Sequence, residues 1–214
     1  MKVRWYFDIV SPYAWLHSVR LQALSIPLEL EARPVLFAGL LAHWGQLGPA
    51  EVPPKRAFTY RHVQWLAERD GVALRWPPGH PFNPLMLDRL CCLLAPAPAA
   101  VHEVFAWVWR DGGDPRDFQG ICQLAERLGV TDAPARLRDD AVKADLRAHT
   151  AAAISDGVFG VPTLVVDGQV FWGRDGLDML RVHLADPTVF ASAAYAELAA
   201  LPVLAEREIK KNPA

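Results

Sequence analysis

Hydrophobic and polar positions alternate in two short stretches near the beginning of the chain, residues 2–7 and 28–35. Alternation with a period of two is typical of half-buried β-strands, and the first stretch is also rich in aromatic residues. Between them, residues 12–24 have helical spacing of apolar positions. A strand, a helix and a second strand in such close succession form a βαβ unit, so we expect the two strands to be parallel.

The pattern changes to helical periods from residue 36 to about residue 154, with glycine and proline at the breaks. It predicts helices over residues 54–69, 84–94, 101–110, 115–128 and 133–153. Strand-like residues return at 163–172, where Asp167-Gly168 between two β-rich runs predicts a hairpin. A helix over 174–184 follows, and the remaining residues predict one more helix and a polar tail.

The order of these elements is that of an α/β thioredoxin fold interrupted by an all-helical domain. We therefore predict a thioredoxin-like domain made of residues 1–36 and 155–186 and a helical insertion over residues 37–154. Residues 187–214 are assigned to the C-terminal helix and tail.

The first predicted helix begins at a position with chemical interest. Ser11 lies where an N-cap residue belongs and Pro12 where the first helical residue belongs. A thioredoxin-type redox protein carries Cys-x-x-Cys at this turn, whereas here Ser11 and Ala14 occupy the two cysteine positions, which excludes dithiol exchange. The helix end still favours an anion, and a serine there can donate to a thiolate supplied by another molecule. Ser11 is therefore either a simple helix cap or part of a thiolate site.

Pro162 begins the strand expected beside Ser11. A proline at the start of a strand is common, and one interpretation is an ordinary strand beginning. In thioredoxin folds, however, the proline at this place is cis and the residue before it pairs with a peptide-like substrate. Val161 is then expected to present its backbone N–H and C=O groups to such a ligand.

Composition narrows the classes of function. The chain has 214 residues, of which 52% are hydrophobic, and a net charge of −2, which argues against an electrostatic nucleic-acid binder. No apolar run reaches the ~18 residues that a membrane span needs, and the three cysteines, Cys91, Cys92 and Cys122, lack disulfide or zinc spacing. We therefore expect a cytoplasmic protein that binds neither membranes nor nucleic acids. The histidines show no ligand spacing, so no metal site is expected.

Two blocks of the sequence resemble the 2-hydroxychromene-2-carboxylate isomerase family, which is related to kappa-class glutathione transferases and has a DsbA-like architecture. They are FDIVSPYAWL at residues 7–16 and GVFGVPTLVVDG at residues 157–168, the second continuing as FWGRDGLD at residues 171–178. Weaker similarity runs through the insertion, and the resemblance covers roughly residues 2–184.

The resemblance implies glutathione as cofactor and assigns residues to it. Ser11 matches the serine that faces the glutathione sulfur, and Val161 with Pro162 matches the pair whose backbone holds the cysteinyl part. The γ-glutamyl end is assigned to Trp172, Gly173, Arg174 and Asp175. In chemical terms, Arg174 can pair with a carboxylate and Asp175 can accept from an ammonium group, although both are also ordinary residues for a first helical turn.

The acceptor side is less well matched. The family has a Gly-Asn pair after the second strand, whereas here Gly45-Gln46 takes this place. Gln46, Lys55 and Asn83 are the candidate substrate contacts, with a solvated lysine and a helix N-cap as the ordinary interpretations of the last two.

The resemblance predicts a glutathione-dependent cis–trans isomerase of an aromatic keto acid, in aromatic hydrocarbon catabolism. The eight tryptophans and the long apolar helices favour a homodimer. Two alternatives stay open, because the same activated sulfur serves a kappa-class-like transferase or peroxidase, and the loss of both cysteines also fits a catalytically silent DsbA-like binding module.

Overall fold

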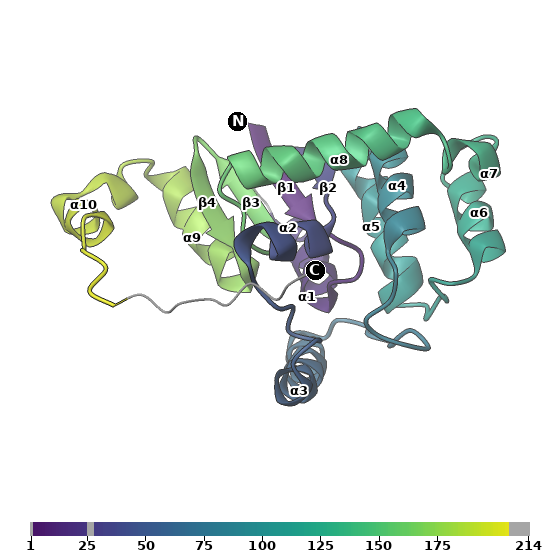
Figure 1. Cartoon of the computed structure of the whole chain (residues 1–214), viewed down its shortest axis with the longest axis horizontal. Helices are drawn as coiled ribbons and strands as arrows, with labels where there is room; N and C mark the ends of the chain where they lie inside the picture. Colours follow the sequence, from purple (N-terminus) through teal and green to yellow (C-terminus); the bar gives the residue numbers. More distant parts are fainter. Residues whose placement is uncertain (1, 25–27, 206–214) are drawn as a thin grey trace.

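A four-stranded sheet lies at the centre of the computed structural model, which describes residues 2–24 and 28–205. The strands are β1 (Lys2–Phe7), β2 (Glu29–Pro34), β3 (Thr163–Val166) and β4 (Gln169–Trp172), in the order β2-β1-β3-β4 (Figure 1). β1 and β2 are parallel, as the βαβ pattern predicted, and β3 is antiparallel to both β1 and β4.

The predicted hairpin joins β3 to β4. Asp167 and Gly168 have φ angles of 49° and 75°, so both residues lie in the left-handed region. A two-residue turn with positive φ at both positions matches the twist of the flanking strands, and aspartate followed by glycine tolerates it. This local chemistry explains why the hairpin could be recognised in the sequence.

Helices surround the sheet and form the long segment between β2 and β3. α1 (Pro12–Gln22) connects β1 to β2, and α9 (Gly173–Ala185) follows β4 and contacts α1. The inserted helices are α2 (Phe37–Trp44), α3 (Pro53–Asp70), α4 (Leu85–Leu94), α5 (Pro98–Trp109), α6 (Phe118–Arg127), α7 (Ala133–Arg136) and α8 (Asp140–Ser155). Beyond α9, a short 3₁₀ turn η1 (Val189–Ala191) precedes α10 (Ala193–Ala199).

Two helical predictions were wrong. α2 was not predicted at all, because it has only 8 residues and its N-cap, Leu36, makes no side-chain capping bond. The single helix expected over residues 133–153 is divided into α7 and α8, since the Asp139 side chain accepts from the N–H of Ala141 (2.9 Å) and starts a new helix there. Smaller shifts occur elsewhere, for example at α1, which ends at Gln22, and at α5, which begins at Pro98.

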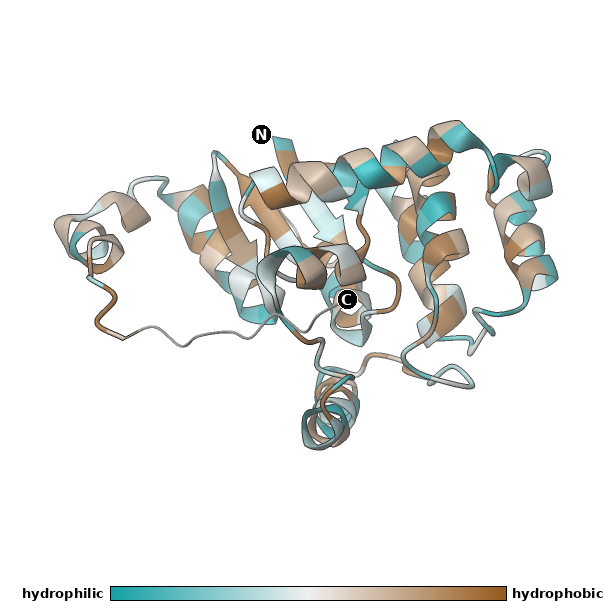
Figure 2. Ribbon diagram, viewed as in Figure 1, coloured by the Kyte–Doolittle hydropathy of each residue, from teal (hydrophilic) through white to brown (hydrophobic). Residues whose placement is uncertain are grey.

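Both faces of the sheet are covered. Along β1, Trp5 and Phe7 pack into the larger hydrophobic core with Phe105 of α5, whereas Tyr6 faces a second cluster with Leu40 of α2. Hydrophobic residues dominate β3 and β4, and α8 alternates between hydrophilic and hydrophobic along its length (Figure 2). Its buried residues lie on one side: Val142, Leu146, Thr150 and Ala153.

Among residues 2–24 and 28–205, no helix is both long and apolar enough to cross a membrane.

The end of α5 is joined to the loop that follows β1. Trp109 is fully buried, and its indole N–H donates to the carbonyl group of Ile9 at 2.9 Å. This bond links residues 100 positions apart in the chain and ties the helical insertion to the sheet.

Substitution of Trp109 tests this link. Trp109→Phe leaves the buried Ile9 carbonyl group without its donor, so we expect the free energy of unfolding to fall by about 1–3 kcal/mol. Chemical denaturation monitored by circular dichroism measures it. Trp107→Phe on the same helix is the control, because the structure gives the Trp107 indole no hydrogen bond within the described residues. Equal losses in the two variants contradict the assignment.

Candidate functional site

The topology brings Ser11 and Val161 to the same end of the two central strands. β1 and β3 are antiparallel with Tyr6 opposite Thr163, so the end of β1 meets the beginning of β3. Ser11 follows β1 after a short loop, and Val161 precedes β3. Ser11, predicted to donate to a thiolate, and Val161, predicted to bind a peptide-like ligand, therefore lie next to the ends of two adjacent central strands.

Ser11 is the N-cap of α1, as predicted. Its side-chain oxygen accepts from the N–H of Ala14 at 3.3 Å, and Pro12 is the first helical residue. The side chain is largely buried, with 8% of the residue's surface exposed. Within the described part of the chain its hydroxyl group donates to no acceptor. The hydroxyl proton is therefore available to a ligand at the positive end of the helix dipole.

The loop between β1 and Ser11 is held by carboxyl groups. Asp8 accepts from the N–H of Val10 (2.8 Å) through one oxygen and from the N–H of Phe37 (2.9 Å) through the other. Asp88 of α4 accepts from the N–H of Ile9 at 3.1 Å. These bonds connect the loop to the beginning of α2 and to α4.

The carbonyl groups of the same loop are also satisfied. In addition to the Trp109 bond to Ile9, His80 places its Nε2 atom 2.9 Å from the carbonyl oxygen of Val10. A carbonyl oxygen only accepts, so Nε2 carries a proton. The Tyr60 hydroxyl group lies 2.8 Å from Nδ1 of the same ring. Burial lowers the pKa of His80, which keeps the imidazole neutral near pH 7. The main chain that precedes Ser11 is thus fixed by partners from the insertion.

The main chain of Val161 has free hydrogen-bonding groups. The Val161–Pro162 peptide is cis, as expected for this proline. No hydrogen bond to the N–H or C=O of Val161 is found among the described residues. Three residues before Val161, the carbonyl group of Val158 accepts from the indole N–H of Trp44 at 2.9 Å. The end of α2 therefore lies against the segment that presents Val161.

Trp172 also lies against this segment. Its ring lies 5.1 Å from that of Phe159, and a Cβ atom on Gly160 would come within 2.7 Å of its indole nitrogen. Only glycine lets the indole approach the main chain so closely at this position. Trp172 is 53% exposed, so one side of the ring remains open to solvent and to ligands.

The first turn of α9 completes this group of predicted residues. The N–H of Gly173 donates to the carbonyl oxygen of Pro162 at 2.8 Å, which fixes the helix end beside the cis peptide. No acceptor is found for the N–H groups of Arg174 and Asp175 within residues 28–205. The Asp175 side chain is exposed. The structure thus brings Val161, Pro162, Trp172 and Gly173 together, with Arg174 and Asp175 following directly.

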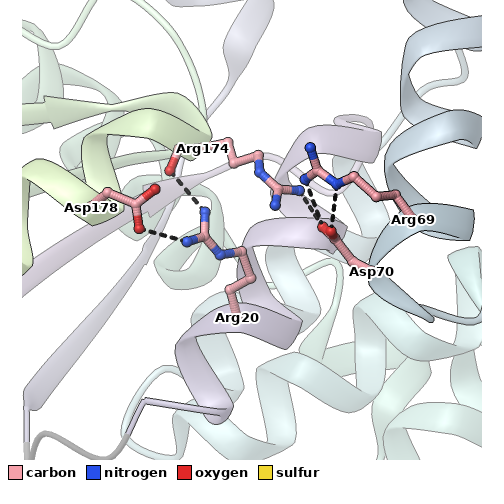
Figure 3. Close-up of polar contacts among 5 residues, drawn as sticks. All are labelled: Arg20, Arg69, Asp70, Arg174 and Asp178. Atoms are coloured by element: carbon pink, nitrogen blue, oxygen red, sulfur yellow. Dashed lines mark hydrogen bonds and ion pairs between the residues drawn. The ribbon is translucent and has the colours of Figure 1, made fainter.

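Arg174 takes part in an ion-pair network (Figure 3). Its guanidinium group pairs with Asp70 at the end of α3, which also pairs with Arg69 (2.8 Å). The two arginines hold the pKa of Asp70 well below its usual range. Arg20 of α1 donates to the Arg174 carbonyl group (3.1 Å) and pairs with Asp178 (2.7 Å). Because the Arg174 side chain is 24% exposed, a carboxylate ligand would meet it beside Asp70.

The three predicted substrate contacts lie in different places. Gln46 is exposed just after α2, two residues beyond Trp44, and therefore near the Val158 segment. Lys55 is exposed in the first turn of α3. Asn83 precedes α4, and its side chain accepts from the N–H of Leu85 at 3.1 Å, although the N-cap residue itself is Pro84. Its oxygen is therefore already engaged in the turn.

Sequence reasoning missed the residues that support the site rather than contact a ligand. Asp8, His80, Asp88 and Trp109 hold the loop before Ser11, and Trp44 holds the Val158 segment. Only Asp8 offered a signal, as a charged residue in an apolar strand end. In the described ranges, no group of three or more histidine, cysteine, aspartate or glutamate side chains is arranged to hold a metal ion.

Residues 2–185 match the family described as the DSBA-like thioredoxin domain. A 2-hydroxychromene-2-carboxylate isomerase of Sphingobium xenophagum is 32% identical over 196 residues, covering 86% of this chain and 98% of that protein. Glutathione S-transferase kappa 1 of Rattus norvegicus is 28% identical over 203 residues, covering 85% and 89% of the two chains.

A solved structure of a 2-hydroxychromene-2-carboxylate isomerase superposes with a TM-score of 0.79 at 27% identity, covering 92% of this chain and 99% of that chain. The cytosolic disulfide reductase DsbM of Pseudomonas aeruginosa, solved with GSH, has a TM-score of 0.58 at 12% identity and shares the fold. These likenesses confirm the predicted thioredoxin-like architecture and its DsbA-like form.

Proposed function

The chain belongs to the DSBA-like thioredoxin domain family, and we propose that it is a glutathione-dependent cis–trans isomerase of an aromatic keto acid similar to 2-hydroxychromene-2-carboxylate. The observation that carries the proposal is the free hydroxyl donor of Ser11 at the N-terminus of α1, on the sheet edge where Val161 offers an unpaired main chain. Relatives named as isomerases of this substrate span the same fold and support the choice of reaction.

The energetics of thiol activation fit this arrangement. A free thiol with a pKa near ~8.5 is only a few per cent ionised at pH 7. Lowering that pKa by ~2 units requires about 2.7 kcal/mol of preferential stabilisation of the thiolate. A hydrogen bond from Ser11 to the charged sulfur contributes about 1.5–3 kcal/mol, and the helix end about 0.3–1 kcal/mol. Together these two interactions are of the required size.

In the proposed reaction, the hemiketal ring of the substrate opens, as the C2–O ring bond breaks and the hydroxyl proton passes to the phenol oxygen. The glutathione thiolate then adds to the double bond conjugated with the resulting keto group. A carbon–sulfur bond forms, the electron pair moves to the carbonyl oxygen as an enolate, and the former double bond becomes a single bond that rotates. Collapse of the enolate expels the thiolate and re-forms the double bond in the trans configuration. No proton or electron is lost or gained overall, so neither a metal nor a protein cysteine is needed.

The remainder of glutathione is assigned to the segments around Ser11. We assign its cysteinyl main chain to the N–H and C=O groups of Val161, beside Pro162. Its γ-glutamyl carboxylate is assigned to the N–H groups at the start of α9 and to Arg174, and its ammonium group to Asp175. Trp172 covers the same end of the ligand from the hairpin side.

We assign the keto acid to the region next to the C-terminal end of α2. Gln46 is the first candidate to contact it, because the Trp44 bond to Val158 keeps this part of the chain next to the Val161 segment. Lys55 is a second, exposed candidate for the substrate carboxylate. Asn83 stays in the proposal only as a contact through its amide nitrogen, since its oxygen is used by Leu85.

The relative from Rattus norvegicus favours one alternative, a kappa-class-like transferase or peroxidase that uses the same thiolate. Product analysis separates the two activities. Incubation of 2-hydroxychromene-2-carboxylate with the protein and glutathione is expected to give the trans isomer with glutathione unchanged. Accumulation of a glutathione conjugate supports the transferase, and the absence of any glutathione binding supports a silent binding module.

The proposal also includes a cytoplasmic homodimer, for which Phe58 and Trp65, both about half exposed on α3, offer apolar surface.

Removal of the Ser11 hydroxyl group tests its role. Loss of one hydrogen bond to a charged sulfur predicts that Ser11→Ala lowers the rate of isomerisation at saturating glutathione by roughly 10- to 100-fold. Because Ser11→Ala also removes a helix cap, Asp117→Ala, which removes the cap of the distant α6, is the matched control and keeps the full rate. An unchanged rate in Ser11→Ala contradicts the role given to Ser11.

Removal of the Arg174 charge tests whether this residue binds glutathione. Loss of its guanidinium group predicts glutathione binding about 3- to 10-fold weaker in Arg174→Ala, measured by titration calorimetry. Arg181→Ala removes the same charge from an exposed position of α9 and serves as control. If both variants bind glutathione like the wild type, or both lose the same affinity, Arg174 does not contact the ligand.

A further inference from the structure

Two carboxyl groups are buried next to each other at the loop between β1 and Ser11. Asp8 follows β1 and is 1% exposed, and Asp88 lies in the first turn of α4 and is fully buried. The reaction proposed above uses neither of them. A buried carboxylate is costly unless it is paired or hydrogen-bonded, so the pair requires an explanation.

Their hydrogen bonds hold the main chain that leads to Ser11 and connect it to the beginning of α2. Asp8 accepts from Val10 and Phe37, while Asp88 accepts from Ile9 through Oδ1. The second oxygen of Asp88, Oδ2, is buried and has no hydrogen-bond partner in standard geometry among the described residues. One carboxylate therefore has two backbone donors and the other has only one.

This asymmetry decides which group is ionised. Burial raises the pKa of Asp8 to about 6, even though its two backbone bonds act in the opposite direction. Burial, and then the charge of Asp8, raise the pKa of Asp88 well above its ordinary value. With more donors, Asp8 carries the negative charge near neutral pH, and Asp88 keeps its proton.

No cation among the described residues compensates a second charge at this place. The other titratable groups nearby are Cys91 and Cys92 of α4, whose thiol pKa values are raised mainly by burial, and His80 on the Val10 carbonyl group, whose pKa is lowered by burial. All three are neutral near pH 7. The charge on Asp8 is therefore tolerated only while Asp88 is protonated.

We propose that Asp88 is a positioning residue for Ser11: as a neutral carboxylic acid it holds the Ile9 N–H, permits the adjacent Asp8 to stay charged on Val10 and Phe37, and so fixes the loop that delivers the Ser11 hydroxyl group. The inference rests on the proposed function in giving that hydroxyl a ligand. Loss of the Asp88 proton places two charges side by side without a counter-ion, and their repulsion displaces the loop.

Asp88→Asn isolates the proton from the shape of the side chain. The amide keeps an oxygen for the Ile9 N–H and cannot ionise. A carboxyl group whose pKa is raised on folding stabilises the folded protein fully below its unfolded pKa of about 4, and this contribution is lost as the pH rises toward the folded value. We therefore compare the melting temperature of Asp88→Asn with that of the wild type at each pH. The variant's melting temperature minus that of the wild type is expected to increase by at least about 3 °C between pH 5 and pH 8.

The matched control for this measurement is Asp145→Asn, the same change at an exposed position of α8. Scans of both variants and of the wild type are made without glutathione, so the result is independent of the proposed activity. If the difference in melting temperature between Asp88→Asn and the wild type changes with pH no more than that for Asp145→Asn, Asp88 is not protonated beside a charged Asp8 and the proposal is overturned.

The link to Ser11 is tested by a second substitution. Asp88→Leu removes the acceptor of Ile9, so amide hydrogen exchange at Ile9, measured by NMR, is expected to accelerate at least about tenfold, and Asp88→Asn restores protection. With 2-hydroxychromene-2-carboxylate and glutathione, Asp88→Leu loses about tenfold in kcat with little change in KM, and Asp88→Asn recovers kcat and retains it to higher pH than the wild type.

The outcomes distinguish the two proposals. A wild-type kcat in Asp88→Leu overturns the positioning role even if the protein is an isomerase. Absence of glutathione binding by the wild type overturns the isomerase and with it the assignment to Ser11, whereas the melting scans still decide whether Asp88 is protonated beside a charged Asp8.

Discussion

The site depends on one constraint, the fixation of a short loop between a central strand and a helix. The N–H groups of Ile9 and Val10 and the carbonyl groups of the same two residues all have side-chain partners. Main-chain groups buried without partners each cost about 1–3 kcal/mol, so the loop has a strong preference for this conformation. Three of the four partners, Asp88, His80 and Trp109, come from the helical insertion. The insertion therefore contributes directly to the geometry at Ser11.

A second connection runs through α2. Asp8 accepts from Phe37 at the beginning of this helix, and Trp44 at its end donates to Val158, close to the free main chain of Val161. The helix thus spans from the Ser11 loop to the segment before β3. Through these end contacts, the same short helix connects the loop before Ser11 to the segment that carries the free main chain of Val161.

Local signals account for what could be predicted from the sequence. Ser11-Pro12 is a helix start, Asp167-Gly168 is a two-residue turn, and the alternating strands around α1 require a parallel pair, because each depends on residues that are close in the chain. α2 was missed because it is short and lacks a capping side chain, and the break before α8 because a single residue, Asp139, causes it.

The supporting residues could not be predicted for a different reason. Asp88, His80 and Trp109 lie 70 to 100 positions from the loop residues that they hold, and nothing local in α4 or α5 indicates a partner so far away. The pairing of Arg174 with Asp70 is equally distant, at 104 positions. Residue types and spacing therefore indicate candidate ligand-binding groups, while the network that positions them becomes visible only in three dimensions.

Ser11 is proposed to stabilise a thiolate on bound glutathione. The most direct measurement is an NMR titration of glutathione labelled with ¹³C at the cysteinyl Cβ, bound to the wild type and to Ser11→Ala, because this carbon reports the ionisation of its own sulfur. We expect a thiol pKa lowered by about 2 units in the wild-type complex, with most of the decrease lost in Ser11→Ala. Bound glutathione that titrates near its free value in the wild type would contradict it.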